Sequence, residues 1–139
     1  MEFRSVNKIY QEAFKKHWER PAISNYQGVT LKYGDVARRM AKLHIMFEEC
    51  GLQKGDKVAL CSRNQANWAV AFLASMTYGA VPVPLLHEFK SSNIHHLVNH
   101  SEAKILFVDD VIWEGLTETE MPDLQAIIQV NTFKLLYSA

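Results

Sequence analysis

The sequence has no excess of either charge. Its 139 residues include 15 lysines and arginines and 15 aspartates and glutamates, and no block of like charge extends beyond Lys15-Lys16. Binding to nucleic acid or to an anionic membrane surface usually requires a basic cluster. The composition therefore gives no support to either kind of partner, and we expect no nucleic-acid partner.

The sequence also has little cysteine. Its two cysteines, Cys50 and Cys61, do not form a CxxC arrangement, and charged residues are spread through the first twenty positions. Such a start differs from the apolar core of a secretory signal. We therefore expect reduced thiols and a cytoplasmic protein.

The motifs that usually mark nucleotide or nucleophile chemistry are absent as well. There is no GxGxxG, no GxxxxGK[ST] and no GxSxG, and the six glycines are scattered singly. The acidic pairs Glu48-Glu49 and Asp109-Asp110 are sequence neighbours, whose side chains point apart on a helix. Neither is a ready-made acid/base pair, and we assign no catalytic, cofactor-binding or metal-binding residue to this chain.

Four histidines lie within fourteen positions: His87, His95, His96 and His100. On a helix, His96 and His100 share one face at i,i+4, and two imidazoles at that spacing can bind one zinc ion. A zinc site needs at least a third protein ligand, which no HExxH pattern or nearby cysteine supplies. We expect solvated surface histidines, with binding of an added metal as the alternative.

Charge is missing altogether between Asn64 and Leu86. This stretch is long enough to suggest a membrane span. However, Gly79, Pro82 and Pro84 would break a helix within it. A buried helix followed by a strand explains the run better, so we expect no transmembrane segment.

The chain is organised around residues 57–86. Val58–Cys61 predicts a buried strand, Trp68–Ala74 is apolar at every position, Gly79 ends the predicted helix, and Ala80–Leu86 returns as a second strand. A strand, a helix and a strand over about thirty residues make a βαβ unit, in which the strands are parallel.

Further elements are predicted on both sides of this unit. Before it come an amphipathic helix over 6–18, a β-hairpin over 22–33 with its turn at Gln27-Gly28, and a second amphipathic helix over 34–50 ended by Gly51. After it come a helix carrying Ile94, Leu97 and Val98, a strand over 104–108, a helical turn towards Trp113 and a strand over 126–130. Helix-capping side chains are expected at Ser5, at Ser62 or Asn64, at Ser91 or Ser92, and at Asp109 or Asp110.

This alternation predicts an α/β fold. We expect a layered, mainly parallel sheet flanked by helices, with an N-terminal helix and a β-hairpin. A length of 139 residues suits one domain, so we treat residues 1–139 as a single α/β domain.

Five segments of the chain follow one another in a recognisable order. They are Val29–Val36 (VTLKYGDV), Gly51–Leu60 (GLQKGDKVAL), Asn64–Trp68 (NQANW), Phe72–Pro84 (FLASMTYGAVPVP) and Ser101–Asp109 (SEAKILFVD). They resemble the (L)TYxEL, G(L/V)xKGDxVAL, N(S/C)xEW/F, (F)LAxxxxGAVxVP and (D)SEAKVLFV(D/S) segments of the adenylate-forming acyl-CoA synthetase superfamily. The leading helix and the SEAKILFVDD segment favour its long-chain fatty acid–CoA ligase branch.

This resemblance implies a parent enzyme that uses ATP and Mg²⁺ to convert a carboxylic acid into an acyl-adenylate and then transfers the acyl group to coenzyme A. It also implies that the phosphate loop, the nucleotide-binding motifs and the C-terminal lysine lie downstream of these residues. The chain would then be the opening subdomain of the parent's N-terminal domain, a partial domain that is inactive alone. Its main partner would be the remainder of the parent polypeptide. Residues 85–90 depart from the family, which often has a Tyr/Asn-Pro loop there.

The last eight residues, Thr132–Ala139, are largely apolar. An apolar segment of this kind usually requires a neighbour to cover it, and a parallel sheet is normally covered on both faces. We therefore expect exposed apolar surface and self-association at high concentration. The alternative is a self-contained small α/β module that binds a ligand or partner at the carboxyl ends of its strands.

Overall fold

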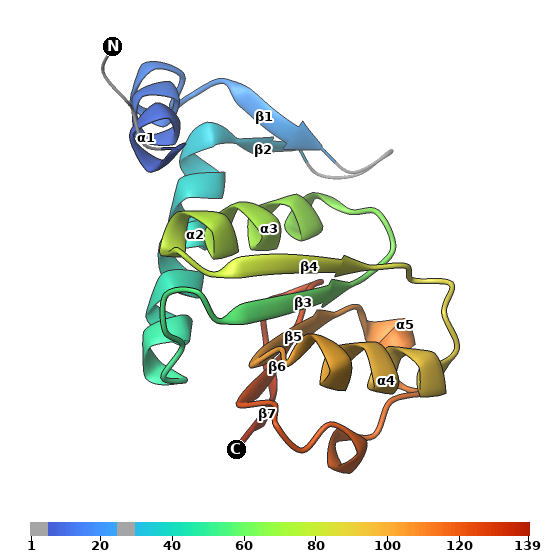
Figure 1. Ribbon diagram of the computed structural model, residues 1–139. Helices are drawn as coiled ribbons and strands as arrows, with labels where there is room; N and C mark the ends of the chain where they lie inside the picture. The colour runs from blue at the N-terminus through green and yellow to red at the C-terminus, as the bar shows by residue number, and fades with distance from the viewer. Residues whose placement is uncertain (1–5, 25–29) are drawn as a thin grey trace.

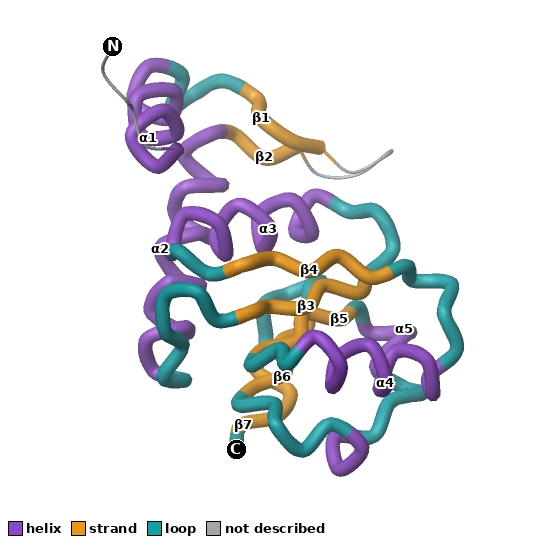
Figure 2. The backbone as a smooth tube through the Cα atoms, viewed as in Figure 1, coloured by secondary structure: helices purple, strands orange, loops and turns teal. Residues whose placement is uncertain are grey.

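The computed structural model describes residues 6–24 and 30–139 and contains a five-stranded sheet with helices on both faces (Figures 1 and 2). Its elements, in chain order, are α1 (Val6–Lys16), β1 (Pro21–Ser24), β2 (Thr30–Lys32), α2 (Tyr33–Glu49), β3 (Lys57–Cys61), α3 (Ala66–Tyr78), β4 (Val81–Leu85), α4 (Ser91–Ser101), β5 (Ile105–Val108), α5 (Asp110–Trp113), a 3₁₀ turn (Glu118–Glu120), β6 (Ala126–Gln129) and β7 (Leu135–Ser138). The predicted α/β class is confirmed.

The sheet has the strand order β4-β3-β5-β6-β7. The first four strands are parallel, and Lys57 pairs with Val81 while Val58 pairs with both Pro82 and Ile105. The βαβ unit at the centre of the prediction is therefore confirmed. Strand β7 runs antiparallel to β6, which makes the sheet mixed. This strand was not predicted from the sequence, because its four residues show no alternation of apolar and polar side chains.

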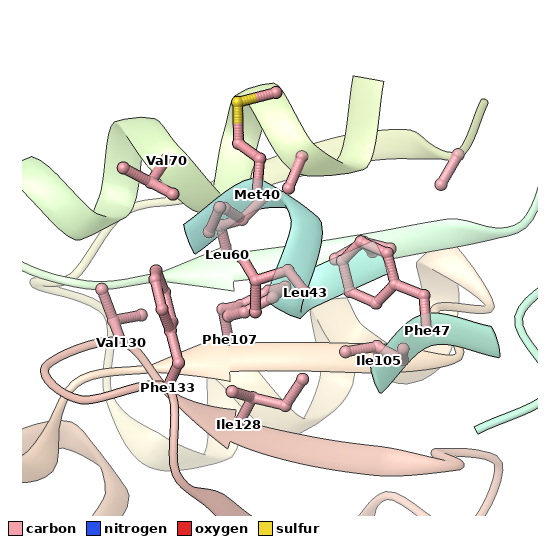
Figure 3. Packing of buried hydrophobic residues seen from close by; sticks show 14 of the residues in the cluster. Met40, Leu43, Phe47, Leu60, Val70, Ile105, Phe107, Ile128, Val130 and Phe133 are labelled. Atoms are coloured by element: carbon pink, nitrogen blue, oxygen red, sulfur yellow. The ribbon is translucent and has the colours of Figure 1, made fainter. Parts of the chain in front are cut away.

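Two hydrophobic clusters cover the two faces of the sheet. Alternate residues of each strand point to opposite faces, so Val58 and Leu60 join one cluster while Ala59 and Cys61 join the other. The first cluster packs under α2 and α3, as Figure 3 shows with Met40, Leu43 and Phe47 of α2 close to Leu60 and Phe107 of the strands. The second is covered by α4, α5 and the segment that leads into β6.

The N-terminal helix and the hairpin lie on the outer side of α2 and α3, away from the sheet (Figure 1). Strands β1 and β2 pair antiparallel, as predicted, while Ser5 and the turn at 25–29 lie outside the described residues. Helix α1 ends at Lys16, so Trp18 is not helical. The Trp18 backbone carbonyl instead accepts the Gly34 N–H at 2.8 Å. A Cβ added at Gly34 would lie 2.7 Å from the indole nitrogen of Trp18.

The helix caps differ in part from the prediction. Neither Ser62 nor Asn64 caps α3, because the N-cap residue is Gln65 and the Ser62 hydroxyl donates to the Arg63 carbonyl. Helix α4 begins at Ser91 itself, which makes Lys90 its N-cap residue and leaves that position without a side-chain cap. Asp109 does cap α5, since its carboxylate accepts the Ile112 N–H at 2.8 Å.

The charge-free stretch forms α3 and β4, as expected. Trp68 and Phe72 stack with their ring centroids 5.4 Å apart and are partly buried against the first cluster. Strand β4 lies at one edge of the sheet, and its Val81 N–H donates to the Asp56 carbonyl that precedes β3. In residues 6–24 and 30–139 no helix combines the length and apolar character needed to cross a membrane.

Gly79 ends α3 in the left-handed conformation, with φ at 98°. This conformation favours glycine because a Cβ comes too close to the following carbonyl. The prediction that Gly79 closes the helix is confirmed.

We expect Gly79→Ala to lower the free energy of unfolding by about 1–2 kcal/mol, because alanine is strained at this φ. Urea unfolding followed by circular dichroism measures the change. Gly79→Asn is the matched control and should lose less, since asparagine tolerates the left-handed region better than alanine does. Equal losses in the two variants would contradict this account.

Candidate functional site at the carboxyl ends of the strands

The carboxyl ends of the parallel strands form the edge of the sheet at which α/β proteins usually place ligands. Polar residues follow three of these strands: Arg63 after β3, Asp109 and Asp110 after β5, and Asn131 after β6. Because β5 lies between β3 and β6 in the sheet, these side chains can reach one another.

Asp109 is the most buried of these residues, with none of its surface exposed. Its carboxylate accepts three hydrogen bonds, from the Arg63 backbone N–H at 2.9 Å, from Arg63 Nε at 3.0 Å and from the Ile112 N–H at 2.8 Å. The ion pair therefore joins the end of β3 to the end of β5, and the same carboxylate begins α5.

Burial opposes ionisation of Asp109, but the N–H groups of Arg63 and Ile112 and the Arg63 guanidinium outweigh it and hold the pKa of this carboxyl below its usual value. The same interaction raises the pKa of Arg63. Asp109 is thus an ionised acceptor with its oxygens already in use, and it holds structure rather than transferring protons.

A second set of contacts extends the network to β6 and to α2. Arg63 Nη2 donates to Asp110 at 3.1 Å, and the Asp110 N–H donates to Asn131 Oδ1 at 3.0 Å. The buried Asn67 donates through Nδ2 to the carbonyls of Val130 and Asn131 at 2.9 and 3.0 Å.

Arg39 of α2 completes this set by donating to Asn67 Oδ1. The amide of Asn67 is therefore held on both sides, by a cation and by the end of β6. Each of the strands β3, β5 and β6 is fixed at its carboxyl end by a side chain from another element.

Cys61 is the buried thiol of this edge. Its Sγ lies 3.7 Å from the Leu86 carbonyl, and burial, followed by the charge of Asp109, raises its pKa to about 11. A thiol with so high a pKa is protonated at neutral pH and is a poor nucleophile. Both Cys61 and the half-buried Cys50 are free thiols, as the sequence predicts.

The histidines lie away from this network. His96 and His100 are exposed on α4 with ring centroids 6.0 Å apart, which confirms that they share the outward face. His95 departs from the expected solvated state, because its Nε2 accepts the Thr117 N–H at 3.1 Å. In the part of the chain that the structure describes, no three His, Cys, Asp or Glu side chains gather to hold a metal ion.

The polar network was not predicted from the sequence, which indicated Asp109 or Asp110 as a helix cap and rejected the two as an acid/base pair. One signal was available, since Arg63 lies two residues and Asp109 one residue beyond a predicted strand, and opposite charges at these two strand ends would meet at one edge of the sheet. Nothing local in the sequence indicates that Asn67, within an apolar helix, bonds to residues more than sixty positions away.

A profile of the family described as "AMP-binding enzyme" matches residues 10–137. The chain is 25% identical over 109 residues to surfactin synthase subunit 2 of Bacillus subtilis, covering 78% of this chain and 3% of that protein. It is 22% identical over 134 residues to a medium-chain fatty-acid–CoA ligase of Escherichia coli, covering 91% of this chain and 24% of that protein.

A solved structure of a long-chain-fatty-acid-CoA ligase from Archaeoglobus fulgidus has the same fold, with a TM-score of 0.78 at 20% identity over 94% of this chain and 28% of the ligase. The chain thus spans about a quarter or less of these relatives. Because these relatives include a surfactin synthase as well as fatty-acid ligases, they support the family and no single branch of it.

We expect Asp109→Ala to lower the free energy of unfolding by about 2–4 kcal/mol, because it removes a helix cap and a buried acceptor of three hydrogen bonds. Chemical denaturation provides the measurement. Asp110→Ala is the neighbouring control and should lose less than about 1 kcal/mol, since its ion pair with Arg63 is exposed. Similar losses for both variants would show that burial of Asp109 does not matter.

The network should also make stability depend on pH. A carboxyl with a lowered pKa in the folded state contributes stability that is present above its unfolded pKa, about 3.9 for aspartate, and is lost as the pH falls through the folded pKa. Denaturation midpoints measured from about pH 5 down to 2 should therefore fall, and fall less steeply in Asp109→Asn. The remaining slope includes Asp35, whose pKa the Lys32 N–H and then Arg38 lower. An unchanged slope in Asp109→Asn would contradict the assignment.

Proposed function

Because the chain belongs to the AMP-binding enzyme family, we propose that it forms the opening part of a long-chain fatty acid–CoA ligase. In this proposal the complete enzyme activates a fatty acid with ATP and then transfers the acyl group to coenzyme A. The chain itself supplies a scaffold and one wall of the acyl and nucleotide cleft.

The observation that carries the proposal is the extent of the family match. It covers residues 10–137 of 139, while the chain spans only 24% of the E. coli ligase and 28% of the A. fulgidus ligase. The choice of the fatty-acid branch rests on the SEAKILFVDD segment, since the relatives include a surfactin synthase as well as a fatty-acid ligase.

The described side chains support a scaffold role more than a catalytic one. Asp109 is occupied by three N–H donors, and Asp110 accepts from Arg63 Nη2 and from the Val111 N–H. Both oxygens of Asp109 already accept hydrogen bonds, and among the described residues no third His, Cys, Asp or Glu joins these two carboxylates to hold a metal ion such as Mg²⁺. In this proposal the remainder of the polypeptide therefore binds ATP, Mg²⁺ and coenzyme A.

What the chain contributes is the fixed position of its strand ends. The Arg63–Asp109 pair joins β3 to β5, and Asn67 joins α3 to the end of β6. A cleft wall needs such rigidity, because small displacements of positioning groups are costly to catalysis.

The remainder of the parent polypeptide is the proposed partner of this chain. Leu86 and Leu135 are exposed by 63% and 43% and offer apolar surface near β4 and on β7. Because this apolar surface is exposed, self-association of the isolated chain at high concentration remains a prediction. The free thiols of Cys50 and Cys61 fit the proposed cytoplasmic location.

The test measures pyrophosphate release with ATP, Mg²⁺, a long-chain fatty acid and coenzyme A. We expect no release by this chain, and fatty-acid-dependent release by a complete relative that carries this segment. A chimera in which residues 1–139 replace the matching segment of that relative should still release pyrophosphate. The same chimera carrying Asp109→Ala should release pyrophosphate more slowly. Turnover by the 139 residues alone would refute the scaffold role. A chimeric ligase that contains residues 1–139 and binds no fatty acid would refute the assignment to the fatty-acid branch.

A further inference from the structure

A pocket of about 350 Å³ lies beside the polar network, at the end of β6 and next to the first turn of α3. Its lining consists of Arg39, Lys42, Asn67, Asn131, Thr132 and Phe133. The pocket is thus built from α2, from α3 and from the turn between β6 and β7. It lies at the same edge of the sheet as the carboxyl ends of the parallel strands.

The lining carries two positive charges and no negative one. Arg39 and Lys42 lie three residues apart on α2, a spacing that places both on one side of the helix. Among the described residues, neither side chain takes part in an ion pair shorter than 4.0 Å. Their charges are therefore available to an anion in the pocket.

Arg39 is oriented rather than loose. It donates through Nη1 to the Oδ1 of Asn67, whose Nδ2 is fixed by the carbonyls of Val130 and Asn131. A guanidinium has five N–H donors in a rigid fork. A single bond to Asn67 therefore sets the direction of the group and leaves donors for a ligand.

The opposite wall is formed by a turn in an unusual conformation. Phe133 is buried, with φ at 58°, in the left-handed region that bulky residues seldom adopt. Its ring packs edge-on against Phe107 at 6.2 Å, which holds the turn in place. The pocket therefore has a preformed wall on each side.

We propose that this pocket binds a phosphoryl anion, either free phosphate or the diphosphate group of a larger molecule. Two cations on adjacent turns match the multiple charge of a phosphate better than the single charge of a carboxylate, and an arginine fork suits phosphate oxygens. The volume admits more than one phosphoryl group. This inference concerns binding by the chain itself and does not rest on the proposed enzymatic function.

The experiment is a titration of the ¹⁵N-labelled chain with sodium phosphate and then pyrophosphate, at an ionic strength kept constant with sodium chloride. Constant ionic strength separates binding from screening. We expect saturable amide shifts at Asn67, Asn131 and Thr132, and tighter binding of pyrophosphate than of phosphate. A parallel titration with acetate should give weaker shifts.

Lys42→Gln is the decisive variant, because Lys42 is exposed and its loss leaves the Asn67 bonds intact. We expect its apparent affinity for pyrophosphate to fall about three- to tenfold, as for loss of one nearby charge. Lys90→Gln, at the start of α4, is the matched control with the same charge change and should bind like the unaltered chain.

Three results would overturn the proposal. The first is the absence of saturable shifts at constant ionic strength. The second is an equal loss of affinity in Lys42→Gln and Lys90→Gln, which would indicate an adventitious ion only. The third is acetate binding as tightly as pyrophosphate, which would assign the pocket to singly charged anions.

Discussion

The arrangement of the carboxyl edge depends on one fully buried carboxylate. Asp109 follows β5, and its two oxygens accept hydrogen bonds from the backbone and side chain of Arg63 after β3 and from the Ile112 N–H in the first turn of α5. A buried charge of this kind is tolerated only when it is paired and hydrogen-bonded. The positions of two neighbouring strands and a helix are therefore linked through a single side chain, and Asn67 adds the third strand.

The parts of the fold that local patterns determine could be predicted from the sequence. The apolar run at Trp68–Ala74, the glycine at position 79 and the two flanking strands correspond to α3, its left-handed end, β3 and β4. Strand β7 could not be predicted, because its place depends on the turn at Phe133 rather than on its own pattern. The predicted cap at Ser62 is wrong because its hydroxyl donates to the Arg63 carbonyl instead. The predicted cap at Ser91 is wrong because α4 already begins at this residue.

The candidate site was harder to predict than the fold. Its contacts join residues 46 positions apart, as in Arg63 and Asp109, or more than sixty positions apart, as in Asn67 and Val130. Such pairs can be recognised as neighbours only when the strand order is known. The strand order β4-β3-β5-β6-β7 does not follow from any one segment of the sequence. The pocket lined by Arg39 and Lys42 was harder still to predict from the sequence, because its opposite wall belongs to the turn before β7, the strand that was not predicted.

The prolines of β4 restrict how the sheet can grow. The Val81 N–H points towards β3, and alternate residues of a parallel strand face opposite neighbours, so Pro82 and Pro84 face the open side. Proline has no N–H, and this margin therefore offers carbonyl oxygens without the donors that an incoming strand would need. Any extension of the sheet, whether by a further strand or by aberrant pairing between copies, is directed to the opposite margin at β7.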